Sequence, residues 1–532
     1  MTKEATQLPS KKRSIAALSS AGLITVIISY ALAISLAVIC LLLPFALLFF
    51  IPLENITFLF GRFLLSAFGL VVGFTILWSL LPRSSPAAPP GVLIDISAEP
   101  RLHTEIKAIA EALHEPMPSE IYLVTAANAF VLEAPGPGRT TRHRIMGLGL
   151  PLLQMLSIAQ FRAVLAHEFA HYYTGDTRLG PWVYDARRTM EGVYRNLGRK
   201  ANLLGFLRRW TVVAVSYKLL MASLRAYWKL FMRVTQAISR RQEFRSDELA
   251  CYLAGSQALI DGLESICKCS AGLDSYWNSF VLPVAMGGFQ PDLSKGFQEF
   301  MQMPPVVQST TNYLKQQMTI ENPSPFDSHP PLSRRIDEAR RLNRPAPTTL
   351  AMNNPSDQLM ISLLENVESL EAGLIKVALP ALAAVNLKPL NWEAAGEDVY
   401  IPLWQKQLQN FMSLLSTKTI ADLSLLVVDP GPLAALAVNP SLGRLSQSQR
   451  IAQSYDVLFC AVALCLLGNG WKLIVRPGQI VLTNGDSTID PGATIGALRS
   501  GALNVVSWRS FLKQHGIGNW PLAVPIAQRR AL

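Results

Sequence analysis

The feature that most limits how this chain can fold is a pair of long apolar runs near its N-terminus. Residues 15–53 carry no charged side chain, and residues 56–81 carry only Arg62. Each run is longer than the roughly 20 residues that a helix needs to cross the hydrocarbon core of a membrane. A cleaved signal peptide is the alternative, because residues 11–13 are basic, but its apolar region would span only about 7 to 15 residues. We therefore expect a retained anchor of two transmembrane helices within residues 15–82.

The basic residues before the first run predict the orientation of this helical hairpin. Residues 1–14 should stay in the cytoplasm by the positive-inside rule. An even number of spans returns the chain to the same side at Arg83. The region that follows the hairpin is therefore expected to be cytoplasmic.

The chain as a whole is basic, with a formal net charge of +11. It contains no basic run interleaved with aromatic residues and no signature of a nucleic-acid module, so we expect no nucleic acid as a partner. A basic domain held beside anionic lipid accounts for the charge, which makes the lipid membrane a partner. The six cysteines show no pattern of a disulfide framework, and this fits a reducing compartment.

Composition divides the chain beyond the anchor at two proline-containing linkers. A helix at about residues 100–114 and a strand at about residues 120–125 predict that the first soluble domain begins with a small sheet. The expected fold class is α+β and mainly helical, with an α/β C-terminal domain of unknown role. The expected order is a basic N-terminus (1–14), two transmembrane helices (15–82), a linker (83–91), a first soluble domain (92–340), a linker (341–357) and the C-terminal domain (358–532).

The C-terminal domain has no spacing typical of a catalytic site. Its apolar run at residues 457–467 is too short to cross a membrane and predicts a buried helix. Residues 472–475 and 479–483 flank Pro477-Gly478 and predict a β-hairpin.

The strongest chemical signal is the sequence His-Glu-Phe-Ala-His at residues 167–171. A capping box of Ser157 and Gln160 predicts that a helix begins just before it. Residues four apart on a helix face the same way, so His167 and His171 can bind one metal ion with Glu168 beside the open coordination positions. This geometry is typical of a zinc hydrolase. The alternative is a buried helix whose two histidines only form hydrogen bonds.

A catalytic zinc site needs a third protein ligand besides two histidines and a water molecule. The segment at residues 239–250 supplies Glu243 and Asp247, four apart on a predicted helix. Glu243 is expected to be the third ligand, and Asp247 to accept a hydrogen bond from a ligand histidine and fix its tautomer. The alternative is a solvated charged helix in which neighbouring arginines pair with both acids.

Residues 203–242 have a long helical pattern with Lys218, Arg225, Lys229 and Arg233 on one face and apolar residues opposite. The pattern fits a helix that lies on, or rises from, an anionic membrane surface. It fits equally a long solvated helix packed on its own domain. A third transmembrane span is disfavoured, because it would have to accommodate four cations.

These motifs resemble a known family. The His-Glu-x-x-His sequence, the Glu243-x-x-x-Asp247 segment, the motif at residues 328–336 (Ser-His-Pro-Pro-Leu-x-x-Arg-Ile) and the Asn-Ala-Phe element at residues 128–130 occur in the order of the HtpX-like integral-membrane zinc peptidases. The eukaryotic relatives of that family include the CAAX prenyl proteases. The resemblance covers about residues 92–340 and leaves residues 350–532 outside it.

The resemblance implies a gluzincin-type endopeptidase of the bacterial inner membrane, with one Zn²⁺ per chain. It implies that His167, His171 and Glu243 bind the metal and that Glu168 is the general base. His329 would then stabilise the oxyanion or position the peptide, and Asn128 would lie beside the bound substrate. The chain departs from the HtpX pattern between the metal motifs, where that family has two apolar spans and this chain has the basic helical segment.

The expected function is a membrane-anchored zinc endopeptidase that acts at the cytoplasmic face on membrane or misfolded proteins, with Glu168 activating a zinc-bound water. One alternative is a sensor or signal transducer in which proteolysis is confined to one partner or to self-cleavage. Another is a non-catalytic scaffold that keeps zinc for structure. Cleavage of prenylated proteins is disfavoured, because that branch uses a membrane chamber built from more spans.

Overall fold

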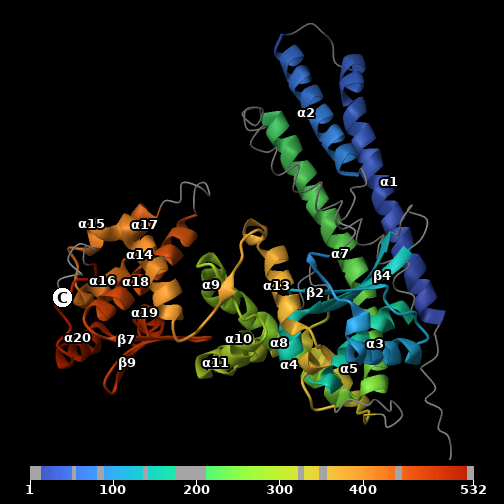
Figure 1. Cartoon of the computed structure of the whole chain (residues 1–532). Coiled ribbons are helices and arrows are strands. Elements are labelled where there is room, and N and C mark those ends of the chain that lie inside the picture. Colours follow the sequence, from blue (N-terminus) through green and yellow to red (C-terminus); the bar gives the residue numbers. More distant parts are fainter. Residues whose placement is uncertain are drawn as a thin grey trace, which may run out of the picture. The chain divides into compact units, whose positions relative to one another are not determined.

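The computed structural model describes residues 13–50, 56–80, 89–135, 142–173, 211–320, 329–346, 356–437 and 446–523 (Figure 1). Most of the predicted basic N-terminus and large parts of both predicted linkers lie outside these residues. The chain divides into two compact units: Met1–Lys268 with Asn312–Leu370, and Cys269–Thr311 with Glu371–Leu532. Residues 269–311 group with the C-terminal unit in this division, and the predicted bounds of the two soluble domains, 92–340 and 358–532, stay a prediction.

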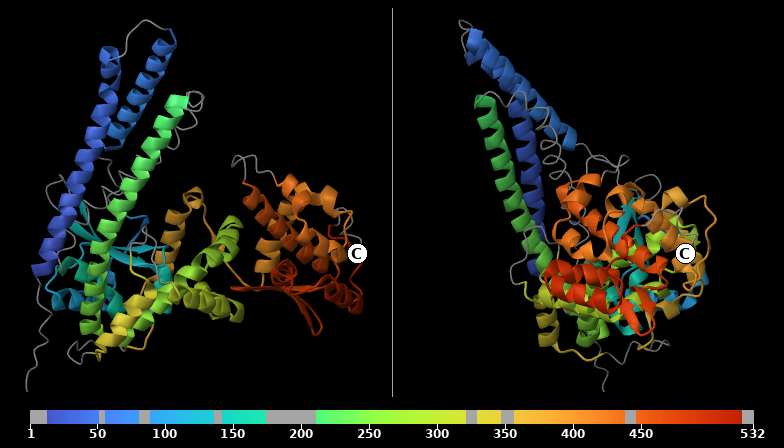
Figure 2. Two further views of the ribbon diagram at one scale, coloured as in Figure 1. Left: turned by 180° about the vertical axis from the view of Figure 1, so that it is seen from behind. Right: turned by 90° about the vertical axis from the view of Figure 1, so that its left-hand side faces the viewer.

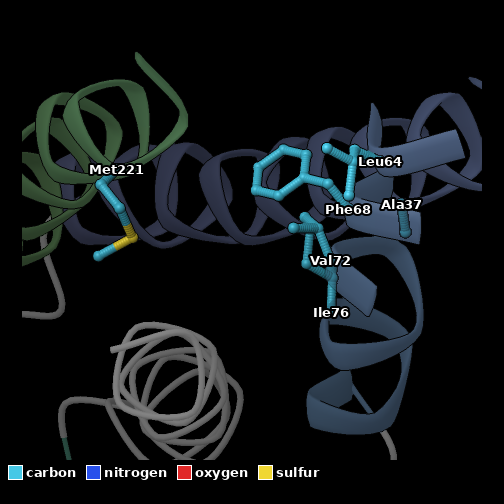
Figure 3. Packing of buried hydrophobic residues seen from close by; sticks show 6 residues of the cluster. All are labelled: Ala37, Leu64, Phe68, Val72, Ile76 and Met221. Atoms are coloured by element: carbon cyan, nitrogen blue, oxygen red, sulfur yellow. The ribbon is translucent and has the colours of Figure 1, made fainter. Parts of the chain in front are cut away.

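The first unit begins with two long apolar helices, α1 (Arg13–Phe50) and α2 (Ile56–Leu80). Each contains a stretch long and apolar enough to cross a membrane, at Tyr30–Phe49 and Leu59–Trp78. Pro44 lies inside α1 without ending it. Figure 3 shows the small apolar cluster between these helices and a third one, α7 (Thr211–Ala254). Its buried members are Ala37, Leu64, Phe68, Val72, Ile76 and Met221.

The predicted small sheet is present and has four strands, in the spatial order β1-β2-β4-β3. Strands β2 and β4 are parallel, and the other two neighbouring pairs are antiparallel. Strand β3 is therefore an edge strand, and it packs on the metal-motif helix α5. The strands are β1 (Gly91–Leu93), β2 (Glu120–Val124), β3 (Ala129–Pro135) and β4 (Arg142–Gly149).

Helix α5 (Ile158–Tyr173) is held in the core between α3 (Pro100–Ala112) and α7. The predicted capping box is formed: the backbone N–H of Gln160 donates to Ser157 Oγ, and the N–H of Ser157 donates to Gln160 Oε1. Such reciprocal bonds satisfy N–H groups that have no partner within the helix. The capping box thus fixes where the metal-motif helix begins.

The segment after residue 356 belongs to the first unit and completes the start of α5. The carbonyl groups of Ser356 and Gln358 accept hydrogen bonds from the N–H groups of Ala159 and Ile158. Glu99, which is buried, accepts hydrogen bonds from the N–H groups of Glu365 and Asn366. The remaining elements here are α4 (Leu150–Met155), α12 (Leu332–Leu342) and the 3-10 helices at Ile96–Ala98 and Met360–Leu363.

Three helices contain residues of both units: α8 (Ser256–Tyr276), α11 (Pro304–Met318) and α13 (Val367–Ala378). The second unit is built around α18 (Gln447–Gly468), whose residues 460–466 are buried. This helix is also long and apolar enough to cross a membrane, but the burial of its side chains fits the core helix that the sequence predicts.

The predicted hairpin of the second unit is formed by β7 (Lys472–Arg476) and β8 (Gln479–Asn484), and β9 (Ser487–Ile489) extends it to three strands. A two-residue pair joins β5 (Phe289–Gln290) to β6 (Lys388–Pro389). The helices of this unit are α9 (Leu282–Met286), α10 (Lys295–Gln302), α14 (Ile401–Leu408), α15 (Met412–Leu415), α16 (Leu423–Val428), α17 (Gly431–Leu436), α19 (Pro491–Ser500) and α20 (Val505–Gln514). The mainly helical class with small sheets is thus confirmed.

Candidate metal centre

The predicted metal-binding histidines lie side by side on α5. His167 is buried and His171 is half-buried, and one helical turn separates them. Phe161, Leu165 and Phe169 of the same helix are fully buried and fix its position in the core. Glu168 is half-buried next to the pair. The helix thus holds both imidazole rings at one side of the first unit, with a carboxylate beside them.

The third predicted ligand comes from α7 and meets the two histidines. The Nε2 atoms of His167 and His171 are 3.3 Å apart. Glu243 Oε2 lies 3.5 Å from His167 Nε2, and Glu243 Oε1 lies 3.7 Å from His171 Nε2. Tetrahedral zinc with bonds of about 2.0 to 2.1 Å sets its ligand atoms about 3.3 Å apart. With one ligand atom taken from each of the three residues, all three atoms lie within 4.8 Å of one another, so the group could hold a single metal ion.

The carboxylate of Glu243 is buried, and both of its oxygen atoms face imidazole nitrogens. Burial of a charged carboxylate is costly unless it is paired with a cationic group or binds a metal ion. The nearest basic neighbour of Glu243 is Nδ1 of His329, at 2.8 Å, from a side chain that is 58% exposed. The approach of three imidazole rings to this one carboxylate fits a ligand to a cation.

Asp247, one turn beyond Glu243 on α7, reaches the other side of the first histidine. Its Oδ1 atom lies 2.9 Å from His167 Nδ1, so that Nε2 of the ring is left to face Glu243 and His171. Arg335 of α12 donates two hydrogen bonds to the same carboxylate, of 2.8 Å to Oδ2 and 2.7 Å to Oδ1. A bidentate pair of this kind fixes the plane of the carboxylate. Arg335 and Asp247 together hold the imidazole of His167 in place.

The charges of this network shift the proton affinities of its members. Burial disfavours the charged form of His167, but the hydrogen bond and the charge of Asp247 outweigh it and raise the pKa of His167 to about 10. Burial works against ionised Asp247 as well, yet Arg335 and then His167 lower its pKa to about 2. For Glu243, burial is outweighed by His167 and His329, which lower its pKa well below the usual range. Without a metal ion, a proton on His167 balances these buried carboxylates.

Two residues of the network were not assigned from the sequence. Arg335 belongs to the motif at residues 328–336, but only the structure shows that it pairs with Asp247. Ser246 is fully buried, and its hydroxyl lies 3.3 Å from Nδ1 of His171, the position that Asp247 occupies for His167. The sequence feature that could have indicated this role is the position of Ser246 directly before Asp247 on α7. Each ligand histidine therefore has a polar partner behind it.

Of the two remaining predicted site residues, His329 lies at the candidate metal centre and Asn128 does not contact it. His329 is beside Glu243, and its exposed ring leaves it open to a bound substrate. Asn128 is exposed and directly precedes the edge strand β3. None of the contacts between described residues joins Asn128 to the three candidate ligands. The structure thus brings together His167, His171, Glu243, Asp247 and His329, and leaves Asn128 at the end of the neighbouring strand.

The fold and the site define a class: a chain with long apolar N-terminal helices and a candidate metal centre built from His-Glu-x-x-His on one helix and a glutamate on the next. Residues 97–343 match the family profile described as "Peptidase family M48". "Protease HtpX" of Xylella fastidiosa is 27% identical over 222 residues, which are 41% of this chain and 65% of that protein. "Protease HtpX homolog" of Methylibium petroleiphilum is 28% identical over 187 residues, 34% of this chain and 61% of the relative. The protein of the same name from Acaryochloris marina is 26% identical over 204 residues, 36% and 63% of the two chains.

Residues 97–343 of this chain are thus similar to peptidase family M48 and to proteins named HtpX, the family that the motifs predicted. The chain spans 61 to 65% of the length of these three relatives, and its residues beyond 343 lie outside the family match. No solved structure matches the chain.

Proposed function

We propose that this protein is a membrane-anchored, zinc-dependent endopeptidase that hydrolyses peptide bonds of membrane or misfolded proteins at the cytoplasmic face. The observation that carries the proposal is the convergence of His167, His171 and Glu243 to donor separations of 3.3 to 3.7 Å, with Glu168 beside them. The similarity to proteins named HtpX supports the same class of activity.

Three protein ligands are one fewer than the four of tetrahedral zinc, so an ion held by His167, His171 and Glu243 would have one position for a water molecule or a substrate oxygen. Zinc, when bound, supplies a Lewis acid that polarises the scissile carbonyl and lowers the pKa of water to about 7. His167, His171 and Glu243 would hold the ion, and Asp247 with Arg335 would keep His167 in the tautomer that binds through Nε2. The buried network therefore positions the ion, while the half-buried Glu168 is free to take part in proton transfer.

Glu168 acts as general base and then as general acid. Its carboxylate takes a proton from the attacking water and returns it to the nitrogen of the leaving amine, so that one carboxylate serves both steps. His329, with its ring exposed and 2.8 Å from Glu243, stabilises the negative charge that develops on the carbonyl oxygen or positions the peptide.

The edge strand β3 provides a place for the substrate backbone. An edge strand has unpaired N–H and C=O groups, and an extended peptide can add to it as a further strand. Asn128 directly precedes β3, and β3 packs on the helix that carries Glu168. A peptide that pairs with β3 from Ala129 onward therefore lies next to the helix of the metal motif.

The proposal is tested by degradation of casein, an unfolded protein, by the full chain purified in detergent. Cleavage should stop after zinc is removed with a chelator and return when zinc alone is added back. Cleavage that continues in the chelated sample would contradict a zinc peptidase. Stable zinc binding without casein cleavage would instead favour the alternative of a protease confined to one partner.

A further inference from the structure

The first half of α7 presents a basic face. Lys218, Arg225, Lys229 and Arg233 are all exposed, and at 3.6 residues per turn they fall within an arc of about 80°. Among the described residues, none forms an ion pair with Lys218, Lys229 or Arg233. Like charges on one helical face repel one another unless an anion lies against them.

The same part of α7 contacts the predicted membrane helices. Helix α7 runs alongside α1 in each view (Figure 2). Met221 is 7% exposed and belongs to the apolar cluster that includes Phe68, in the middle of the candidate span Leu59–Trp78. Val215 and Leu219, close to Met221, are 57% and 66% exposed. Large exposed apolar side chains next to two spans are expected where a helix faces lipid.

The length of α7 gives the level of each cation relative to the membrane. Lys229 and Arg233 follow Met221 by eight and twelve residues, which is a rise of about 12 and 18 Å along the helix. Half of the hydrocarbon core is about 15 Å thick. If Met221 lies near the middle of the spans, Lys229 and Arg233 lie where the hydrocarbon gives way to headgroups. Arg225 lies deeper, about 6 Å from Met221, and its long side chain can extend along the helix toward the headgroups.

We propose that Lys229 and Arg233, with Arg225 on the same face, form a binding site for the headgroups of anionic phospholipids in the leaflet next to the metal centre. A phosphate group matches these side chains, because a guanidinium can bind two of its oxygens and an ammonium attracts it as a point charge. The site is continuous with the apolar surface of Val215 and Leu219, which accommodates the acyl chains.

This surface is on the helix that supplies a candidate metal ligand. Glu243 follows Arg233 by ten residues, about 15 Å along α7, and the helix is continuous between them. The described helix contains neither proline nor glycine from Thr211 to Ala254. A headgroup held at Arg233 therefore restrains the same rigid element that carries Glu243.

The test measures lipid preference of the full chain in detergent, by energy transfer from tryptophan to dansyl-labelled phosphatidylglycerol or phosphatidylcholine. Each Lys or Arg near an anionic surface contributes about fivefold in affinity, from about 1 kcal/mol per residue. The Lys229→Glu, Arg233→Glu variant should lose at least tenfold of the preference for phosphatidylglycerol. The matched control is Lys107→Glu, Lys315→Glu, which makes the same charge change at two exposed residues outside α7 and should keep the preference.

Circular dichroism and zinc content of each variant show whether it is folded. If the double glutamate variant does not fold, Lys229→Gln, Arg233→Gln should lose the preference, and Lys229→Arg, Arg233→Lys should keep it. Inorganic phosphate should compete no better than chloride of equal ionic strength, because the site takes a lipid. Equal binding of both lipids by the unaltered chain, an unchanged preference in the folded α7 variants, or an equal loss in the control would overturn the proposal.

Discussion

Replacement of Arg335 by glutamine tests how the metal centre is positioned. Arg335 is 8% exposed and Asp247 is 1% exposed, and two hydrogen bonds of 2.7 and 2.8 Å join them. Removal of one partner of a buried ion pair leaves the other charge uncompensated and costs about 3 to 5 kcal/mol. The pKa of Asp247 would rise, and its hold on the tautomer of His167 would weaken.

The expected effect on metal binding follows from the position of Asp247. Loss of a residue that orients a ligand histidine weakens metal affinity about 10- to 100-fold, or about 1.4 to 2.7 kcal/mol. Zinc affinity is measured by competition with a coloured chelator, and stability by thermal unfolding of the detergent-purified chain. Both should fall in Arg335→Gln, and Arg335→Lys should be intermediate because it keeps the charge without the bidentate geometry.

The matched control is Arg334→Gln, which removes the same kind of side chain one residue earlier on α12, where it is exposed. This variant should change zinc affinity by less than about twofold, as expected of a surface substitution. The reasoning is refuted if Arg335→Gln binds zinc as tightly as the unaltered chain, or if Arg334→Gln is impaired to the same extent.

Three further predictions concern the same unit. Asp247→Asn should weaken zinc binding about 10- to 100-fold, whereas Glu248→Gln, at the next and less buried position, should not, as chelator competition will show. In the zinc-free chain, the raised pKa of His167, about 10 against 6.5, gives stability that is complete below pH 6.5 and is lost as the pH rises toward 10. The lowered pKa of Asp247, about 2 against 3.8, gives stability that is present above pH 3.8 and is lost as the pH falls toward 2. The midpoint temperature of thermal unfolding, measured in excess chelator, should therefore be highest between pH 3.8 and pH 6.5. A maximum above pH 8 would contradict the assignment. Glu99→Ala should lower the free energy of unfolding by about 1 to 3 kcal/mol, because the N–H groups of Glu365 and Asn366 lose their buried acceptor. Glu111→Ala, exposed on helix α3, which Glu99 precedes, should leave it within about 0.5 kcal/mol.

The local features of the metal-motif helix could be predicted because they depend on neighbours in the sequence. The capping box of Ser157 and Gln160 needs residues three apart, and the facing of His167 and His171 needs residues four apart. The proximity of Glu243 to these histidines could also be predicted, because only a small number of residue types complete a zinc site.

Features that depend on tertiary packing could not be predicted in the same way. Arg335 pairs with Asp247 across 88 residues, and an arginine on a charged helix is usually solvated. The sequence pattern of residues 203–242 and the segment with Glu243 were expected as separate features, whereas α7 continues without a break to Ala254. It ends before Gly255, whose φ of +92° lies in the left-handed region.

The contacts that group residues 269–311 with the C-terminal residues could not be predicted from the sequence pattern either. No linker composition separates them from the preceding helix, and α8 continues through Lys268 and Cys269. Their grouping with the C-terminal unit depends on contacts with residues more than 70 positions away, such as the hydrogen bonds from the N–H groups of Leu293 and Ser294 to Glu371. Such contacts leave no periodic signal in the chain.

The most direct test of the central claim is a measurement of zinc content and casein cleavage on the same preparation of the Glu168→Gln variant. Glu168 is not one of the three candidate ligands, so the variant should retain one zinc ion per chain and lose casein cleavage. His167→Ala, a ligand variant, should lose both. Full cleavage by zinc-loaded Glu168→Gln would contradict the account, because the carboxylate would then not be the group that moves the proton.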